Sequence, residues 1–178
     1  MEVIAKVLKR EIPLHAHAHR ADDIATVIRI AEEFNLRLVI IHCTEGHKIA
    51  KTIARAKVPV VVGPTIYWVS KPETRERGFE TAVALYKAGV KVALQTDSLT
   101  PMNYFPLLPM YVIKHGMKRE DALKCVTINP AEILDIDGRV GSLEKGKDAD
   151  IVVWSGHPFE FYSKVEHVFI NGETVKLD

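Results

Sequence analysis

The chain has 178 residues, of which 47% are hydrophobic and 26% charged, a composition typical of one globular domain with a small appendage and not of a disordered or coiled-coil protein. Its 24 basic and 23 acidic side chains give a net charge of +1, which argues against nucleic acid or an anionic membrane as partner. No apolar run approaches the roughly 18 residues of a membrane span, and the charged start is unlike a signal peptide. We therefore expect a cytoplasmic protein whose two cysteines, Cys43 and Cys125, are buried and unpaired.

Hydrophobic periodicity predicts alternating helices and strands along the first part of the chain. Helices are expected at residues 3–9, 22–34, 48–56 and 79–86, and strands at 12–18, 36–41, 58–62 and 90–94. Asp22 or Asp23 is expected to cap the second helix, and Asn35 to end it in the left-handed conformation. Because the strands are near-continuous Val, Ile and Leu runs, we expect a parallel sheet, buried on both faces and joined by helical crossovers.

Turn signals divide the rest of the chain. Gly63-Pro64 is expected to stop the third strand, with lining of the pocket as the second interpretation. Two further helices are predicted over 107–115 and 119–134. Beyond them, glycines separate short β-prone segments at 151–154 and 165–170, and Asn171-Gly172 favours a hairpin turn. The sequence therefore predicts an α/β part over 1–136 and a small antiparallel β element over 137–178.

Polar side chains that can bind metals lie at the ends of three predicted strands. His15, His17 and His19 alternate, which places them on one face of the first strand, while His42 follows the second strand and Asp97 the fourth. Since the carboxyl ends of parallel strands share one rim of the sheet, His, His and Asp are expected to meet there. Imidazole and carboxylate together suit a zinc-type ion.

Each of these residues also has a plain structural interpretation. A lone strand-end histidine is more often a hydrogen-bonded loop residue than a ligand, alternating histidines can be a surface stripe, and a lone aspartate such as Asp97 more often caps a turn. Strand alternation places His42 on the face of Leu38 and Ile40. The convergence of three strand ends favours the metal site. Four other histidines are expected on the surface without partners: His47, His115, His157 and His167.

The same residues resemble the amidohydrolase superfamily, particularly the branch of imidazolonepropionase and the metal-dependent prolidase-like enzymes. The resemblance covers nearly the whole chain. It rests on segments 14–18 (LHAHA), 42–46 (HCTEG), 95–97 (QTD), 127–131 (TINPA) and 141–151 (GSLEKGKDADI). It implies an α/β fold that is the C-terminal half of a (βα)8 TIM barrel, strands five to eight, followed by a small antiparallel tail from a flanking sandwich.

The resemblance also implies roles for individual residues. His17 corresponds to the fifth-strand metal ligand, His42 to a histidine that binds a second metal or contacts substrate, and Asp97 to a metal ligand and general base towards the water that attacks the scissile carbonyl carbon. The implied cofactor is a divalent metal, zinc first. The family's first-strand His-x-His pair and fourth-strand ligand have no counterpart here, because the chain resembles only half of a barrel of about 250 residues.

The expected function is metal-dependent hydrolysis of amide or cyclic amide C–N bonds in small molecules or dipeptides, with an N-terminal half required for chemistry. Two alternatives stay open: a non-catalytic truncated half-barrel, and an independent α/β binding module. The outer strands, 12–18 and 90–94, are expected to have unpaired edges, and Leu14, Leu38 and Ile40 to face the barrel centre without an opposite wall. We therefore expect a homo-oligomer, or a complex with a complementary N-terminal half chain.

Overall fold

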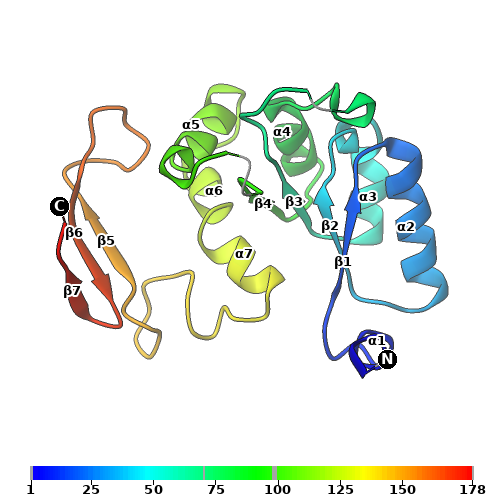
Figure 1. The fold of residues 1–178 in the computed structure, drawn as a ribbon, viewed down its shortest axis with the longest axis horizontal. Helices are drawn as coiled ribbons and strands as arrows, with labels where there is room; N and C mark the ends of the chain where they lie inside the picture. The colour runs from blue at the N-terminus through cyan, green and yellow to red at the C-terminus, as the bar shows by residue number, and fades with distance from the viewer. Residues whose placement is uncertain (1, 70, 98–99, 178) are drawn as a thin grey trace.

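The computed structural model describes residues 2–69, 71–97 and 100–177, and its main element is a four-stranded parallel sheet (Figure 1). The strands lie in the order β1 (Leu14–Ala18), β2 (Leu38–His42), β3 (Val60–Val62) and β4 (Val92–Leu94). Parallel pairing places Leu14 beside Leu38, Ile40 beside Val60, and Val60 beside Val92. This arrangement confirms the predicted parallel α/β sheet, in which all strands end at one rim.

Helices join consecutive strands and bury the predicted apolar positions. Their bounds are α1 (Glu2–Leu8), α2 (Ala21–Glu33), α3 (Ala50–Ala56), α4 (Phe79–Lys87), α5 (Leu107–Lys114), α6 (Arg119–Lys124) and α7 (Ile128–Ile133), with short 3-10 turns η1 (Gly46–Ile49), η2 (Pro72–Thr74) and η3 (Met102–Tyr104). Ile24 of α2, Ile53 of α3 and Leu85 of α4 are fully buried against the sheet. Asn35 ends the α2 connection in the left-handed conformation, φ 52°, as predicted.

The start of α2 differs from the prediction. Its N-cap residue is Arg20, and Asp22 and Asp23 lie in the first helical turn without a side-chain cap. The backbone N–H of Ala21 instead donates to the carboxylate of Glu45, at 2.9 Å. The carboxylate comes from the loop after β2, so a residue distant in sequence satisfies the orphan donor of this helix.

The helix predicted over 119–134 is two helices, α6 and α7. The chain breaks at Thr127, where φ is −129° and ψ −88°. Pro130 explains the break, because proline has no N–H and its ring would clash with the carbonyl four residues earlier in a continuous helix.

This break changes the expected edge of the sheet at β4. The side-chain amide of Asn129 donates to the carbonyl of Val92 at 2.7 Å, and the backbone N–H of Leu94 donates to the carbonyl of Cys125 at 3.0 Å. The prediction that both outer edges are unpaired is therefore wrong for β4, where the chain between α6 and α7 occupies backbone groups. β1 is the other terminal strand of the sheet, as predicted.

The two faces of the sheet are the reverse of those predicted. Leu38 and Ile40 lie in the main core with the helices, and Leu14 packs against that core. The opposite face carries a second, smaller cluster formed by Val39, Ile41, Ala93 and Ile133, with Val61 packed against it. Leu14, Leu38 and Ile40 therefore do not form an open apolar wall. Both faces of β2 are apolar, so the sequence alone does not distinguish them.

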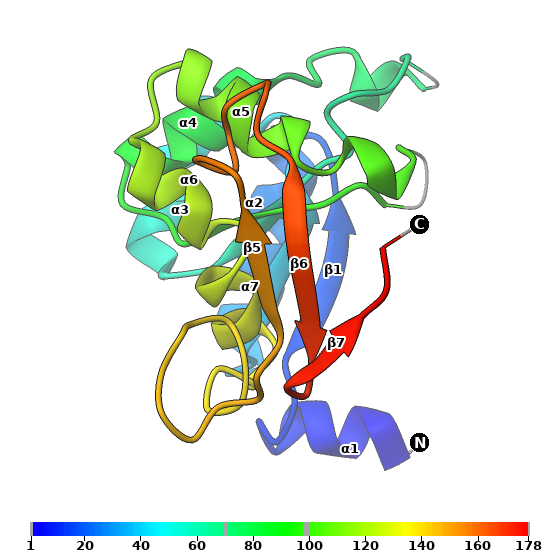
Figure 2. The ribbon, with the colours of Figure 1, turned by 90° about the vertical axis from the view of Figure 1, so that its left-hand side faces the viewer.

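The end of the chain forms a separate antiparallel sheet of β5 (Ile151–Trp154), β6 (Val165–Ile170) and β7 (Glu173–Val175). Asn171 and Gly172 both have positive φ, 52° and 80°, as the predicted hairpin turn requires. Helices α5 to α7 stand between this sheet and the parallel sheet (Figures 1 and 2). Both cysteines are buried free thiols, as predicted. Across the described ranges, no helix is long and apolar enough to cross a membrane.

Candidate active site: a histidine cluster at the carboxyl end of the sheet

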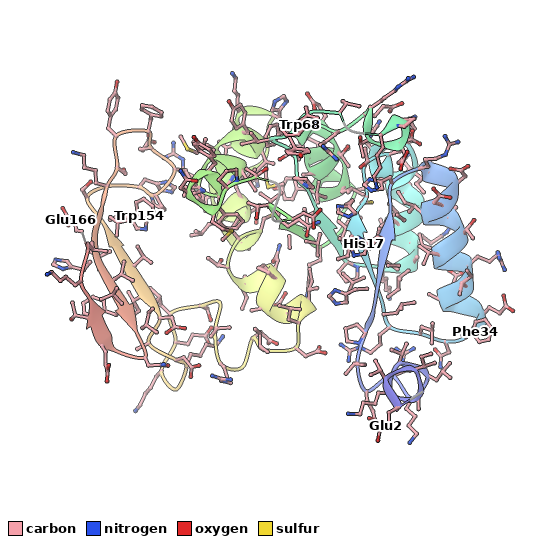
Figure 3. The ribbon with its side chains drawn as sticks, viewed as in Figure 1. Glu2, His17, Phe34, Trp68, Trp154 and Glu166 are labelled. Atoms are coloured by element: carbon pink, nitrogen blue, oxygen red, sulfur yellow. The ribbon has the colours of Figure 1, made fainter. Side chains whose placement is uncertain are left out.

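His17 and His42 are in direct contact at the carboxyl ends of β1 and β2. His17 Nδ1 lies 2.9 Å from His42 Nε2, and the rings meet edge to face with centroids 4.8 Å apart. Figure 3 labels His17 on β1. Because the register pairs His17 with Ile41, His17 points to the face of Ile41 and away from the helix-covered face.

His42 does not follow strand alternation, which corrects the prediction that it shares the face of Leu38 and Ile40. Its backbone is left-handed, with φ 73°, and Cys43 follows with φ 54°. This conformation takes the imidazole off the helix-facing side and towards His17. Left-handed backbone is uncommon for residues other than glycine, and it is enriched where a fold holds functional side chains.

The second ring nitrogen of His42 fixes its tautomer. Nδ1 lies 2.7 Å from the carbonyl oxygen of Gly63, which can only accept, so Nδ1 carries the proton. Nε2 then carries a lone pair, which accepts a hydrogen bond from His17 Nδ1 at 2.9 Å. Burial lowers the pKa of His42, and the opposing effects of the Gly63 hydrogen bond and the Asp97 charge are smaller. The imidazole is therefore held neutral, the form that binds metal or accepts a proton.

Gly63 has a larger role than the predicted strand stop. Its φ is 140°, and a Cβ atom at this position would lie 2.1 Å from the backbone oxygen of Gln95. Only glycine allows β3 and the chain after β4 to approach so closely while the Gly63 carbonyl faces His42. The Gln95 side chain donates to the same carbonyl, at 3.2 Å. Gly63 and Pro64 do line the cavity beside His42, which was the second interpretation of this pair. The sequence did not predict the contacts of Gly63 with His42 and Gln95.

His19 belongs to the same cluster. Its ring stacks on that of His42, with centroids 4.6 Å apart and planes 9° from parallel, and its Nδ1 lies 2.8 Å from Thr44 Oγ1. Burial lowers the pKa of His19 to about 4, with smaller contributions from His42 and from the positive charges of Lys71 and Arg77. His15 points to the same side of β1 as His17, but it is exposed and bonds no described side chain.

Asp97 follows β4 at the same rim, with a left-handed backbone of φ 50°. Its negative charge raises the pKa of both His42 and Arg77, so the three side chains share one electrostatic environment. Residues 98 and 99 lie outside the described part of the chain. Among the residues that are described, no backbone N–H donates to the Asp97 carboxylate and no cation forms an ion pair with it. The turn-capping interpretation therefore gains no support from these contacts.

Three of the histidines expected to be surface residues without partners have partners. His47 Nδ1 lies 3.0 Å from Thr81 Oγ1 and its Nε2 lies 3.1 Å from a Glu76 oxygen. His115 lies 3.2 Å from Glu80, and His157 accepts from the backbone of Phe159 at 3.2 Å. These residues lie in turns and at helix ends, where local backbone and nearby carboxylates are within reach. None of them joins the cluster of His17, His19 and His42.

The donor chemistry of the cluster suits a zinc-type ion, but the set is incomplete. In the described part of the chain, no three His, Cys, Asp or Glu side chains are arranged to hold a metal ion. Two nitrogens, His17 Nδ1 and His42 Nε2, do converge. The bond from the other His42 nitrogen to a backbone carbonyl is the support that metal-binding histidines usually have. The chain thus offers two converging nitrogen donors, with the Asp97 carboxylate nearby.

Comparison with known proteins places these features in context. Residues 1–175 match the model described as the Amidohydrolase family. The chain is 34% identical over 110 residues to an imidazolonepropionase of Thermoplasma volcanium, covering 56% of this chain and 27% of that protein. It is 29% identical over 147 residues to the imidazolonepropionase of Maricaulis maris, covering 80% of this chain and 35% of that protein.

Solved structures match along almost the full chain. An amidohydrolase from Thermotoga maritima superimposes with a TM-score of 0.93 at 49% identity, covering 98% of this chain and 46% of that one. A prolidase complexed with N-methylphosphonate-L-proline superimposes with a TM-score of 0.75 at 23% identity, covering 99% and 48%. The second match shows a shared fold alone. The chain thus spans less than half the length of each of these relatives.

Proposed function

The chain belongs to the amidohydrolase family, and we propose that it supplies one half of the active site of a metal-dependent hydrolase of amide or cyclic amide C–N bonds in small molecules or dipeptides. The observation that carries this proposal is the contact between His17 and His42 at the carboxyl rim, where the bond to the Gly63 carbonyl keeps the His42 Nε2 lone pair directed at His17. Relatives named imidazolonepropionase support cyclic amides within this substrate class.

We further propose that residues 1–136 are strands five to eight of a (βα)8 barrel and that residues 137–178 belong to a flanking β element. The parallel strand order and the match to 46% of the Thermotoga maritima amidohydrolase support this assignment. A complete barrel of this kind has about 250 residues. The remaining strands must then come from outside these 178 residues.

In the complete site, His17 Nδ1 and His42 Nε2 would hold a divalent cation, zinc first. When bound, such a cation lowers the pKa of water towards neutrality and polarises a carbonyl group. Asp97 would accept the proton of the attacking water and return it to the leaving nitrogen, so that the C–N bond breaks without expelling an amide anion. The Gly63 carbonyl keeps His42 in the required tautomer throughout. His19 closes one face of the His42 ring and limits its access to water.

The open edge of β1 is the place where further strands would join. β1 is terminal in the sheet, and α1, which precedes it, exposes Val3, Ile4 and Leu8 at 66%, 64% and 53%. An unpaired strand edge beside exposed apolar residues favours association. We propose that the partner is a complementary N-terminal half chain or a second copy of this chain. A partner that adds strands to β1 without turnover would be the non-catalytic half-barrel.

Reconstitution tests the function. The purified chain is mixed with zinc and with a separate chain that corresponds to strands one to four of the Thermotoga maritima relative, and hydrolysis of a set of dipeptides and cyclic amides is followed. Asp97→Asn removes the base at nearly constant volume and should lower turnover by orders of magnitude with little change in melting temperature. His167→Ala, in the β tail, is the matched control and should retain turnover. Turnover that survives Asp97→Asn would remove Asp97 from the mechanism.

A further inference from the structure

A network of hydrogen bonds links the histidine cluster to helix α4. His19 Nδ1 lies 2.8 Å from the hydroxyl of Thr44, in the loop after β2. The carbonyl of the same Thr44 accepts at 2.9 Å from the hydroxyl of Thr81, near the start of α4. His47 Nδ1 lies 3.0 Å from that Thr81 hydroxyl. The network thus connects a ring of the cluster to His47, a histidine that the proposed function does not use.

The direction of these bonds follows from the protons available. A hydroxyl has one proton and a carbonyl can only accept, so Thr81 donates its proton to the Thr44 carbonyl. Thr81 Oγ1 then accepts from His47, which places a proton on His47 Nδ1. The other nitrogen of the His47 ring, Nε2, lies 3.1 Å from a carboxylate oxygen of Glu76. The His47 ring is therefore held from both sides, and it keeps the Thr81 hydroxyl directed at Thr44.

Charged residues form the outer part of the network. Lys48 donates to the second oxygen of Glu76 at 2.6 Å and lies 3.2 Å from Glu45. Glu45 in turn accepts from the backbone N–H of Ala21 at 2.9 Å. The side chains of Lys48 and Glu76 are 41% and 44% exposed, and exposed ion pairs contribute little. The outer contacts therefore orient His47 and add less to stability than the buried bonds inside.

The inner part of the network is buried. Thr44 is 5% exposed and Thr81 is 2% exposed, and a buried carbonyl that loses its donor is costly. The backbone next to Thr44 is also fixed, because the N–H of Glu45 donates to the carbonyl of His19 at 2.8 Å. Thr44 is thus held at its carbonyl by Thr81 and presents its hydroxyl to the His19 ring.

We propose that Thr81 is a positioning residue for the histidine cluster and that His47 holds Thr81 in place. Through the Thr44 backbone, Thr81 fixes the hydroxyl that directs the His19 ring. His19 stacks on His42 with ring centroids 4.6 Å apart, so a turn of the His19 ring displaces His42. This inference rests on the proposed function of the cluster. Thr81 and His47 act through other residues and move no proton in the reaction.

NMR signals of the ring nitrogens test the proposal without requiring turnover or zinc. The signals of His19 and His42 are recorded in the full chain. Thr81→Val keeps the shape of the side chain and removes the donor, so both sets of signals should shift. Thr81→Ser keeps the hydroxyl and should leave them near their original positions. Tyr86→Phe is the matched control on the same helix: it removes a bond to Asp121, outside the network, and should cause no shift.

Substitutions of His47 separate positioning from folding, because its side chain is 31% exposed and tolerates change. His47→Leu removes the N–H that Thr81 accepts, and should shift the His19 signals by less than Thr81→Val. His47→Gln supplies an amide N–H and should restore them in part. Zinc titration of the same variants should show affinity that falls several-fold in Thr81→Val and is retained in Thr81→Ser.

Unchanged ring signals in a folded Thr81→Val chain would overturn the proposal, and so would equal shifts in Thr81→Val and Thr81→Ser. A lower melting temperature without such shifts would show that Thr81 only stabilises the fold. If Thr81→Val does not fold, His47→Leu decides, and unchanged His19 signals in that variant would overturn the proposal. Shifted signals in a chain that binds no zinc would refute the metal site and leave the positioning role intact.

Discussion

Charged side chains form ion pairs at the amino end of the parallel sheet, and the group at the carboxyl end differs in this respect. At the amino end, cations are paired: Arg37 bonds Asp135 at 2.6 Å, and Lys91 bonds Glu132 at 2.7 Å. At the carboxyl end, the cluster of His17, His19 and His42 and the nearby Asp97 and Arg77 have no such ion pairs among the described residues. At the amino end, the charged side chains are paired within the chain. At the carboxyl end, hydrogen-bond donors and acceptors face a shared space.

Cavity size alone would place the active site at the wrong end of the sheet. A cavity of about 440 Å3 lies at the amino end, lined by residues such as Leu36, Val58 and Pro59 together with the paired Arg37 and Lys91. The cavity beside His42 is about 10 Å3. Chemistry distinguishes the two cavities, because the amino end has paired ions and apolar walls. The carboxyl end has a neutral imidazole, a carboxylate that forms no ion pair with the described residues, and left-handed backbone at His42 and Asp97. In parallel sheets the carboxyl end is also where ligand sites form.

Substitution of one glycine at each end should give the largest difference between the ends in the free energy of unfolding. Gly63→Ala at the carboxyl end places a Cβ 2.1 Å from the Gln95 oxygen at a positive φ, and should cost about 3 kcal/mol or more in the free energy of unfolding. Gly89→Ala at the amino end also has positive φ, 85°, but meets no atom within 4 Å, and should cost about 1 kcal/mol. Urea unfolding measures both, and equal costs would refute the close approach of β3 and Gln95.

Lowering the pH should reduce the stability of the fold through the histidines at the carboxyl end. The pKa of His19 is lowered to about 4, and burial also lowers the pKa of His42, so the unfolded chain binds more protons than the folded chain between about pH 6.5 and pH 4. Stability should therefore be full above pH 6.5 and fall as the pH is lowered towards 4. After allowance for solvent around the half-exposed His19 ring, the loss should be about 1 kcal/mol or more.

His19→Gln should flatten this pH profile, and His167→Ala should leave it unchanged. Unfolding free energies from urea titrations at pH 7 and pH 4.5 decide the matter. A wild-type chain equally stable at both values would show that the cluster accepts protons freely.

Removal of an ion pair at the amino end should have the smallest effect on stability. Arg37→Gln removes the pair with Asp135, whose side chains are 33% and 49% exposed, and should cost less than about 1 kcal/mol, with a smaller cost at high salt. Zinc binding at the other end should not change. Calorimetric melting at low and high salt measures the cost, and a loss of ligand binding in Arg37→Gln would break the distinction between the two ends.

The order of helices and strands was predictable, because apolar periodicity indicates each element and glycines indicate where elements end. The directions of side chains were predictable only in part. Alternation placed His17 correctly, but it failed for His42, whose backbone is left-handed and whose ring contacts His17 and the Gly63 carbonyl. The covered face of β2 was misassigned because Val39 and Ile41 are as apolar as their neighbours.

Long-range contacts explain the other omissions. Asn129 was recognised as part of a motif, yet its bond to Val92 joins residues that are distant in sequence and depends on the break at Pro130. Arg77 lies in a loop without periodicity, so no pattern distinguishes it from other arginines. Only the fold brings Arg77 and Thr65 to the cavity beside His42.

Zinc binding tests most directly the claim that the carboxyl end is a metal-binding active site. Titration calorimetry is carried out on the unmodified chain and on His17→Ala, His42→Ala and His115→Ala. The account predicts weak but measurable zinc binding that falls roughly tenfold or more in each of the first two variants. His115→Ala, which removes a histidine bonded to Glu80 outside the cluster, should bind zinc like the unmodified chain. Zinc affinity that is unchanged in both His17→Ala and His42→Ala would contradict the account.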